Sequence, residues 1–246
     1  MAAIAVQDKV FIRLDFSDPI YKKRRENIFI LAVDCLHPGD TCFCASMDTG
    51  PEVGPGFDLR LTELDEIFLI EIGSELGAKT MEKVPSEAMR RDWSEERRAG
   101  LDKAKGSMGR ALPDAQSVPE LLRNNLQHPQ WKDVATRCLS CTSCTLVCPT
   151  CFCWDVEDST SLDGKSTQRT RVWDSCFNLA YSTQAGGNTR PTTESRYRQW
   201  LTHKMGSWVG QFGVFGCIGC GRCITWCPAA IDLTQEIKAI RVEQAA

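Results

Sequence analysis

The sequence predicts an α+β fold with two dissimilar parts. Apolar runs of strand length fall in residues 1–80, charged helix-prone sequence follows over 81–137, and two copies of one cysteine pattern lie within 138–246. We therefore expect an N-terminal mixed α/β domain with short strands, a charged helical connector, and a mainly helical C-terminal domain. The stretch 149–216 between the two cysteine patterns is expected to be a long insertion in that last domain.

Three short apolar runs predict the strands. Asn27 to Val33 (NIFILAV) has strand length, and Phe57 to Leu61 alternates apolar and polar residues. The run Ile67 to Ile72 follows after a short connector, which predicts two strands joined by a tight turn. Gly and Pro punctuate residues 35–56, so the cysteines at 35–44 are expected on a loop.

Mixed-sign charge over 75–137 is typical of helices with one solvated face. The sequence Ser117-Val-Pro-Glu120 fits a capping box with proline in the first turn, which predicts a helix beginning at Val118. A short helix from Leu233 to Gln244 is expected near the C-terminus.

Composition excludes several classes of function. The net charge of −3 disfavours a nucleic-acid binder that relies on a basic surface. The longest apolar runs are far too short to span a bilayer, and the N-terminus lacks the basic region of a secretory signal. We therefore expect a cytoplasmic protein with neither nucleic-acid nor membrane partners. In that compartment its 14 cysteines favour metal binding or catalysis over disulfides.

The cysteine pattern is C-x-x-C-x-x-C-x-x-x-C-P, written once as CLSCTSCTLVCP at 138–149 and again as CIGCGRCITWCP at 217–228. Three cysteines at this spacing let one loop surround three corners of a [4Fe–4S] cube. In two-cluster ferredoxins the cysteine before proline ligates the other cluster. Proline suits that position because the chain must leave the loop in an extended direction.

This exchange rule predicts a ferredoxin-like domain with two clusters. Cluster 1 would be held by Cys138, Cys141, Cys144 and Cys227, and cluster 2 by Cys217, Cys220, Cys223 and Cys148. The alternative is a pair of structural zinc sites, which favour two C-x-x-C knuckles and four ligands in all. The third cysteine of each motif and the repeated C-P favour iron–sulfur.

The six remaining cysteines form two groups, Cys35, Cys42 and Cys44 on the loop and Cys151, Cys153 and Cys176 in the insertion. Buried free thiols behave as small hydrophobic side chains, which is the simplest interpretation. Three thiols within ten residues of a Gly/Pro-rich loop instead suggest ligands of a third cluster or metal. Cys153 or Cys176 would supply the fourth ligand where the fold brings either one near.

Basic and aromatic residues alternate late in the insertion, where Arg190, Arg196, Arg198 and Lys204 stand among Tyr197 and Trp200. They could hold the insertion against the clusters or face a partner protein, and the sequence does not separate these two roles.

Several motifs are missing. The sequence has no G-x-G-x-x-G fingerprint, no P-loop and no evident Ser/His/Asp set. We therefore expect no flavin or nicotinamide on this chain and assign no catalytic residue. Clusters without a substrate or nucleotide motif favour an electron carrier over a catalyst.

Longer strings carry a resemblance to a known family. They are AVDCLHPGDTCFCASMDTGP, FDLRLTEL, EIGSELG, the two C-P motifs with CPTCFC, RVWDSCF and AGGNTRP between them, and RYRQWLTHK. Together they resemble the iron–sulfur β subunit of cytosolic NiFe sulfhydrogenases, and equally the A subunit of anaerobic sulfite reductase. The resemblance covers nearly the whole chain and is weakest over 79–127.

The resemblance implies a role between modules. In this family the subunit passes electrons between a flavin-bearing, NAD(P)-oxidising subunit and a catalytic module, which is the NiFe hydrogenase small and large subunits or a sirohaem sulfite reductase subunit. Family members usually carry a region upstream of AIAVQDKVF with a Cys-Asp pair just before it. That cysteine would be a natural partner of Cys35, Cys42 and Cys44, and this chain starts after it. Either Cys153, Cys176 or another subunit supplies the ligand in its place, or the third site is incomplete.

The leading hypothesis is therefore an electron-transfer subunit of a hydrogenase complex with two [4Fe–4S] clusters, or with three if the loop cysteines complete a further site. The same relay role in an anaerobic sulfite reductase is an alternative. Two other classes are a reductase with its own substrate-binding cluster at Cys35, Cys42 and Cys44, and a zinc-stabilised interaction module.

Overall fold

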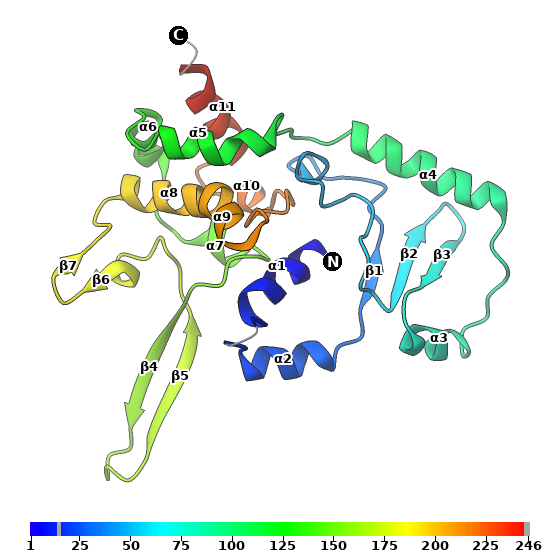
Figure 1. The fold of residues 1–246 in the computed structure, drawn as a ribbon, viewed down its shortest axis with the longest axis horizontal. Helices are drawn as coiled ribbons and strands as arrows, with labels where there is room; N and C mark the ends of the chain where they lie inside the picture. The colour runs from blue at the N-terminus through cyan, green and yellow to red at the C-terminus, as the bar shows by residue number, and fades with distance from the viewer. Residues whose placement is uncertain (14–15, 244–246) are drawn as a thin grey trace. The chain divides into compact units, whose positions relative to one another are not determined.

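The computed structural model describes residues 1–13 and 16–243 (Figure 1). The chain forms two compact units, the first made of Met1–Ala115 with Cys217–Gly221 and the second of Gln116–Gly216 with Arg222–Ala246. The α+β class predicted from the sequence is confirmed. The three-domain division with boundaries after residues 80 and 137 stays a prediction.

The first unit combines one small sheet with short helices. Its elements are α1 (Ala2–Phe11), α2 (Pro19–Glu26), β1 (Leu31–Val33), the 3-10 turn η1 (Cys44–Met47), β2 (Leu59–Glu63), β3 (Phe68–Ile72), α3 (Glu75–Met81) and α4 (Arg91–Gly106). Among the described residues, no helix combines the length and apolar character needed to cross a bilayer.

The sheet has the order β1-β2-β3, with β1 parallel to β2 and β2 antiparallel to β3. The predicted pair of strands joined by a tight turn is confirmed. The first strand is shorter than predicted because Asp58 satisfies the backbone before it: Asp58 Oδ2 accepts from Ile30 N at 2.7 Å, and Ile30 O accepts from Asp58 N at 2.9 Å.

A buried carboxylate fixes both ends of the cysteine-bearing loop. The side chain of Asp34 is fully buried and accepts hydrogen bonds from Val53 N at 2.8 Å, Thr62 Oγ1 at 2.7 Å and Arg97 Nε at 2.9 Å. Burial alone would raise the pKa of Asp34, but these hydrogen bonds and the charge of Arg97 hold it below its usual value. The loop from Cys35 to Val53 is thereby tied to β2 and α4.

The second unit is mainly helical. Its elements are α5 (Val118–Asn124, preceded by the turn η2, Ala115–Ser117), α6 (Gln130–Arg137), α7 (Ser143–Leu146), β4 (Trp154–Thr160), β5 (Thr167–Trp173), η3 (Ala180–Ser182), β6 (Thr183–Gln184), β7 (Gly187–Asn188), α8 (Thr193–Thr202), the π-helix η4 (His203–Ser207), α9 (Trp208–Phe212), α10 (Arg222–Thr225) and α11 (Leu233–Glu243).

The helix predicted to begin at Val118 is confirmed, but the expected capping bond is not formed. Ser117 has helical backbone angles itself, and its Oγ accepts a hydrogen bond from Arg241 Nη2 at 3.0 Å instead. The predicted C-terminal helix is also confirmed from Leu233, and its predicted last residue, Gln244, lies outside the described residues.

The insertion supplies part of the core of this unit. Helix α8 packs against α6 and α5 (Figure 1), and Leu201 on α8 is fully buried, as are Trp131 and Val134 on α6. Trp131 Nε1 donates to Asn125 O at 2.7 Å, so this large side chain is satisfied as well as buried. The stretch 149–216 is therefore a structural part of the domain as well as an insertion between the motifs.

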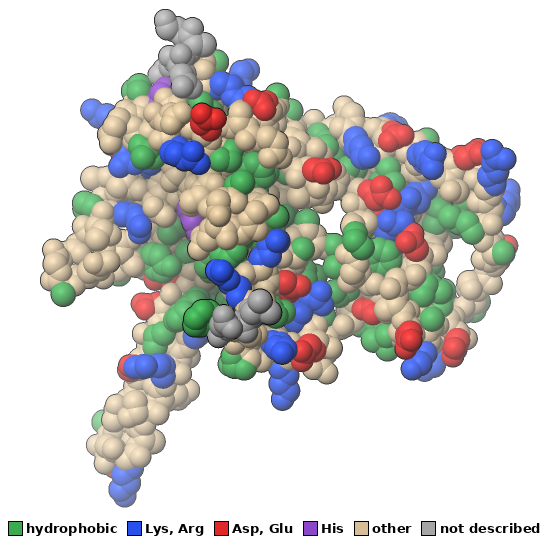
Figure 2. All heavy atoms as spheres, viewed as in Figure 1, with side chains coloured by type: hydrophobic (Ala, Val, Ile, Leu, Met, Phe, Trp, Pro, Cys, Tyr) green, Lys and Arg blue, Asp and Glu red, His purple; other side chains and the backbone are tan. Residues whose placement is uncertain are grey.

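Strands β4 and β5 form a hairpin that extends away from the helices of its unit (Figures 1 and 2). Trp154 pairs with Trp173 at its base, and Cys153 O accepts a hydrogen bond from Asp174 N at 3.1 Å just beyond them. This pairing places Cys153 close to Cys176, two residues after Asp174.

Candidate metal centres

The two cysteine motifs fold into the same loop. Their third positions, Ser140 and Gly219, have φ of 51° and 65°, and their fifth positions, Thr142 and Gly221, have φ of 67° and 68°. In each copy the third residue donates its N–H to the sulfur of the first cysteine, at 3.5 Å for Ser140 and 3.4 Å for Gly219. Backbone N–H groups aimed at cysteine sulfur are one means by which proteins tune iron–sulfur sites.

A one-turn helix follows in the same place in each copy. Helices α7 and α10 both begin at the sixth motif position and end at the ninth, and they contact one another. In each copy the cysteine before proline follows this helix. Its N–H donates at 3.2 Å to the carbonyl oxygen three residues earlier: Cys148 to Thr145, and Cys227 to Ile224. The repeat seen in the sequence is thus a repeat of conformation.

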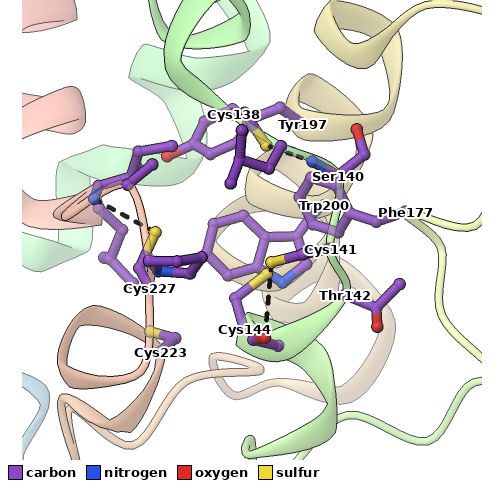
Figure 3. Close-up of a pocket in the computed structure, with 16 residues that line it drawn as sticks. Cys138, Ser140, Cys141, Thr142, Cys144, Phe177, Tyr197, Trp200, Cys223 and Cys227 are labelled. Atoms are coloured by element: carbon purple, nitrogen blue, oxygen red, sulfur yellow. Dashed lines mark hydrogen bonds between the residues drawn. The ribbon is translucent and has the colours of Figure 1, made fainter.

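Within the second unit, one pocket gathers the cysteines of predicted cluster 1 (Figure 3). The sulfur of Cys227 also accepts a hydrogen bond from Ile231 N at 3.3 Å. Cys223, predicted to ligate cluster 2, borders the same pocket. The cysteines that line it are Cys138, Cys141, Cys144, Cys223 and Cys227, and the apolar wall includes Phe177, Tyr197, Trp200, Ile231 and Leu233.

Burial and mutual proximity shift the pKa values of the cysteines in this pocket. Burial, and then the neighbouring thiols of Cys138, Cys227 and Cys141, raise the pKa of Cys144 to about 12. The pKa of Cys138 is raised mainly by burial, whereas a hydrogen bond with Ser143 lowers that of Cys141. Converging thiolates repel one another, and a positively charged iron core would offset that repulsion.

Two buried polar atoms at the pocket have no partner in the described part of the chain. Tyr197 Oη and Trp200 Nε1 are buried donors without an acceptor, and both residues line the pocket. Buried polar groups are nearly always hydrogen-bonded, so two unpaired buried donors in one pocket indicate that an acceptor binds there. Cluster sulfides or cysteine sulfurs would be suitable acceptors, and the donor set therefore fits an iron–sulfur cluster. In residues 1–13 and 16–243, no three His, Cys, Asp or Glu side chains are grouped closely enough to bind a single metal ion.

The cysteines of predicted cluster 2 are divided between the units. Cys217 and Cys220 belong to the first unit, and Cys223 and Cys148 to the second. The sulfur of Cys148 lies 3.1 Å from Lys204 Nζ. A hydrogen bond with Cys151 and then the charge of Lys204 lower the pKa of Cys148 to about 3, against the effect of burial. Cys148 therefore sits in an environment that favours its thiolate.

The loop cysteines pack against the second motif within the first unit. Phe43 N donates to Gly219 O at 2.8 Å, and Thr49 Oγ1 donates to Ile218 O at 2.6 Å. A Cβ on Gly219 would lie 2.7 Å from the backbone of Cys44, and one on Gly221 would lie 2.2 Å from the carbonyl oxygen of Thr41. This close approach explains glycine in the second copy where the first has serine and threonine.

Cys35, Cys42 and Cys44 lie on one loop of the first unit, although their side chains do not form a three-ligand group for a single metal ion among the described residues. Burial raises the pKa of Cys44 first, followed by the charges of Cys42 and Cys35, so the three thiols influence one another. The pKa of Cys35 is likewise raised, chiefly by burial. Cys44 Sγ also lies 3.9 Å from Met108 Sδ.

The remaining cysteines, Cys151, Cys153 and Cys176, lie in the second unit. A hydrogen bond with Cys176 lowers the pKa of Cys153 to about 6 and raises that of Cys176. A similar bond joins Cys151 to Cys148 and raises the pKa of Cys151. The assignment of Cys153 or Cys176 as a fourth ligand for the loop cysteines stays a prediction.

The basic residues of the insertion bind within their own unit. Arg196 is buried and donates to Ser140 Oγ at 3.3 Å and to Pro191 O at 3.0 Å, which ties α8 to the first cysteine loop. Arg198 donates to Leu126 O at 3.0 Å. Of the two roles left open by the sequence, these contacts favour holding the insertion in place.

Sequence reasoning missed the apolar wall of the pocket. Phe177, Ile231 and Leu233 line it, yet only Phe177 carries a local signal, because it directly follows Cys176. Thr150, which lies 3.1 Å from Cys148 Sγ, was also missed, although it stands directly after the C-P pair. Contacts of this kind depend on tertiary folding and have no periodic pattern.

Comparison with known proteins agrees with this geometry. A family described as "4Fe-4S dicluster domain" matches residues 137–231. The chain is 34% identical over 248 residues to "Sulfhydrogenase 2 subunit beta" of Pyrococcus furiosus, an alignment that covers 97% of this chain and 70% of that protein. No solved structure matches the chain.

Proposed function

The chain belongs to the family of iron–sulfur β subunits of sulfhydrogenases, and we propose that it relays single electrons between a flavin- and NAD(P)-binding reductase subunit and a NiFe hydrogenase module. A bound [4Fe–4S] cluster gains and loses one electron at a time, which is the chemistry that such a relay needs. The residues of this chain would hold the clusters, exclude water from them and set their potentials.

The proposal assigns the fourth ligands by exchange between the two motifs. Cluster 1 would take Cys227 beside the first loop, and cluster 2 would take Cys148 beside the second loop. The observation that carries this assignment is the pocket of the second unit, where Cys227 and the first loop line one space. The complete ligand sets are Cys138, Cys141, Cys144 and Cys227, and Cys217, Cys220, Cys223 and Cys148.

A third cluster at the loop cysteines is part of the proposal. The mutual influence of Cys35, Cys42 and Cys44 supports a shared site, and their loop packs on Gly219 and Gly221 of the second motif. A cluster held there would lie next in line to one bound by the second motif, as a relay requires. Cys153, Cys176 or a residue of a partner subunit would complete it.

The protein surroundings of cluster 1 suit electron transfer. Phe177, Trp200 and Leu233 are buried and form an apolar wall that limits access of water. The N–H groups of Ser140 and Ile231 donate to the sulfurs of Cys138 and Cys227 and would lessen the negative charge of a reduced cluster. Both features act by burial and hydrogen bonding, which are the protein's means of setting a potential.

The experiment is purification of the native complex without a tag under anoxic conditions. We expect the chain to co-purify with a NiFe large subunit and small subunit and with a flavin-containing subunit, and to carry iron with acid-labile sulfide. A sirohaem subunit in place of the hydrogenase subunits would assign the relay to a sulfite reductase. Zinc in place of iron would rule out the relay altogether.

A further inference from the structure

A buried lysine contacts one of the proposed cluster ligands. Lys204 is only 5% exposed, and its Nζ lies 3.1 Å from Cys148 Sγ, 3.2 Å from Thr150 Oγ1 and 2.9 Å from Gly216 O. An ammonium group has three N–H donors, and these three acceptors lie within reach of them. The sulfur is therefore one of the acceptors in a defined hydrogen-bond set.

The backbone holds this lysine in position. Lys204 lies in the π-helix η4, which continues α8, and π-turns inside helices are frequent at functional sites. Gly216 N donates to Lys204 O at 2.9 Å, while Gly216 O accepts from Lys204 Nζ. Backbone and side chain are thus both fixed to the residue that directly precedes Cys217.

A charged side chain is not needed to connect Cys148 with Gly216. Thr150 Oγ1 already donates to Gly216 O at 2.6 Å and lies 3.1 Å from Cys148 Sγ, so a neutral hydroxyl connects the same two groups. Burying an ammonium group is costly unless an anion compensates for it. Among the sulfur of Cys148, the hydroxyl of Thr150 and the carbonyl of Gly216, only the sulfur can be anionic, and charge-assisted hydrogen bonds are the stronger kind.

We propose that Lys204 is a positioning residue that raises the reduction potential of the second cluster by donating an N–H···S hydrogen bond to its ligand Cys148. This inference rests on the proposed function, which assigns Cys148 to that cluster. A reduced cluster carries one more negative charge than an oxidised one, so a nearby cation stabilises the reduced form more. The step transfers one electron and no proton.

The test is an EPR-monitored redox titration of the full chain, reconstituted without oxygen, with iron counted in every sample. Lys204→Met removes the charge and the donor, and Lys204→Gln keeps a donor but removes the charge. We expect both variants to lower the potential of one cluster only. At the wild-type midpoint of that cluster, its ratio of reduced to oxidised form should fall about tenfold or more.

A matched control removes a lysine charge elsewhere in the same unit. Lys132 is exposed on α6, so Lys132→Met should leave both potentials unchanged because solvent and salt screen its charge. Lys204→Arg retains the charge and should keep the potential close to that of the wild type. Recovery in this variant, but not in Lys204→Gln, would identify charge as the cause.

Failure of the inference can be told apart from failure of the proposed function. If Lys204→Met and Lys204→Gln retain both clusters with unchanged potentials, the tuning role is wrong, while the relay stands. If both neutral variants lose the second cluster, Lys204 acts in assembly, and the tuning role is equally overturned. If Cys148→Ala leaves both cluster signals unaltered, the ligand assignment itself is wrong.

Discussion

Ser140 and Gly219 occupy the same position in the two cysteine motifs, share a left-handed backbone, and each donate an N–H to the sulfur two residues before. A left-handed conformation costs a residue with a Cβ about 1–2 kcal/mol. In the first loop Ser140 adopts this conformation despite its Cβ. In the second loop the residue is Gly219, because the backbone of Cys44 leaves no space for a side chain. The same loop is therefore built from different residues to suit different surroundings.

The fifth motif position offers a matched pair of variants. In Gly221→Ala the new Cβ would lie 2.2 Å from the carbonyl oxygen of Thr41, so the loop would have to move. We expect a loss of about 2 kcal/mol or more of unfolding free energy, from backbone strain and the steric conflict together. Thr142→Ala, at the same position of the first copy, should change stability by less than about 0.5 kcal/mol. Thermal unfolding of both loaded variants tests this, and equal effects would contradict it.

The exchange of fourth ligands predicts which cluster each variant loses. Cys227→Ala should remove cluster 1 and leave cluster 2, while Cys148→Ala should do the reverse. Two cubes hold about eight iron atoms, so each variant should lose about four iron atoms per chain. The EPR signal of the motif cluster that remains should differ between the two variants. Identical remaining spectra would show that both cysteines serve one cluster.

The unpaired hydroxyl of Tyr197 predicts that its removal changes the reduction potential of cluster 1 without changing the fold. Tyr197 is buried at the pocket of the second unit, and its Oη has no partner among the described residues. If Oη donates to cluster 1, Tyr197→Phe should lower the potential of that cluster and leave cluster 2 unaffected. Redox titration measures this, with unfolding as a check on stability. An unchanged potential would mean that Oη does not donate to the cluster.

The network around Asp34 predicts a loss of stability in the first unit. Asp34→Asn removes the anion that faces Arg97 and disturbs three hydrogen bonds, so we expect a loss of about 3 kcal/mol at neutral pH. Since the folded pKa of Asp34 is lowered, its contribution is complete at neutral pH and is lost as the pH falls through its folded pKa. Thermal unfolding at pH 7 is the measurement. A change below about 0.5 kcal/mol would contradict the account of this network.

The loop cysteines predict a third iron site. Cys42→Ala should lower the iron content from about twelve to about eight atoms per chain and leave both motif clusters intact. The measurement is iron per chain with EPR of each cluster. If the wild-type chain holds only about eight iron atoms and Cys42→Ala changes nothing, the loop cysteines do not hold a cluster.

Local sequence signals identified several of the elements and both cysteine motifs, but not the β4–β5 hairpin of the insertion. The alternation at Phe57–Leu61 and the proline after Val118 each predicted an element that is present. The failed cap at Ser117 has a tertiary cause, since Arg241 lies far along the chain and binds its hydroxyl. Capping patterns describe local competition for hydrogen bonds and cannot include such partners.

The site was predictable where spacing alone fixes the chemistry. The repeated cysteine formula named the cysteines that line the pocket of the second unit, because four thiolates at this spacing have few other uses, while their division between two clusters stays a prediction. The role of Lys204 was not predictable, since its contact with Cys148 spans 56 residues and depends on the π-turn that presents it. The reason for Gly219 was equally unpredictable, because it depends on the close approach of Phe43 and Cys44, which lie far from Gly219 in the sequence.

The central claim is that the two motifs exchange their fourth ligands, and iron positions test it most directly. An anomalous difference map at the iron edge, from crystals of the loaded chain, locates each cube among its cysteines. We predict one cube bound by Cys138, Cys141, Cys144 and Cys227, and Cys148 on the cube of the second motif. A map that places Cys148 and Cys138 on the same cube would contradict the account.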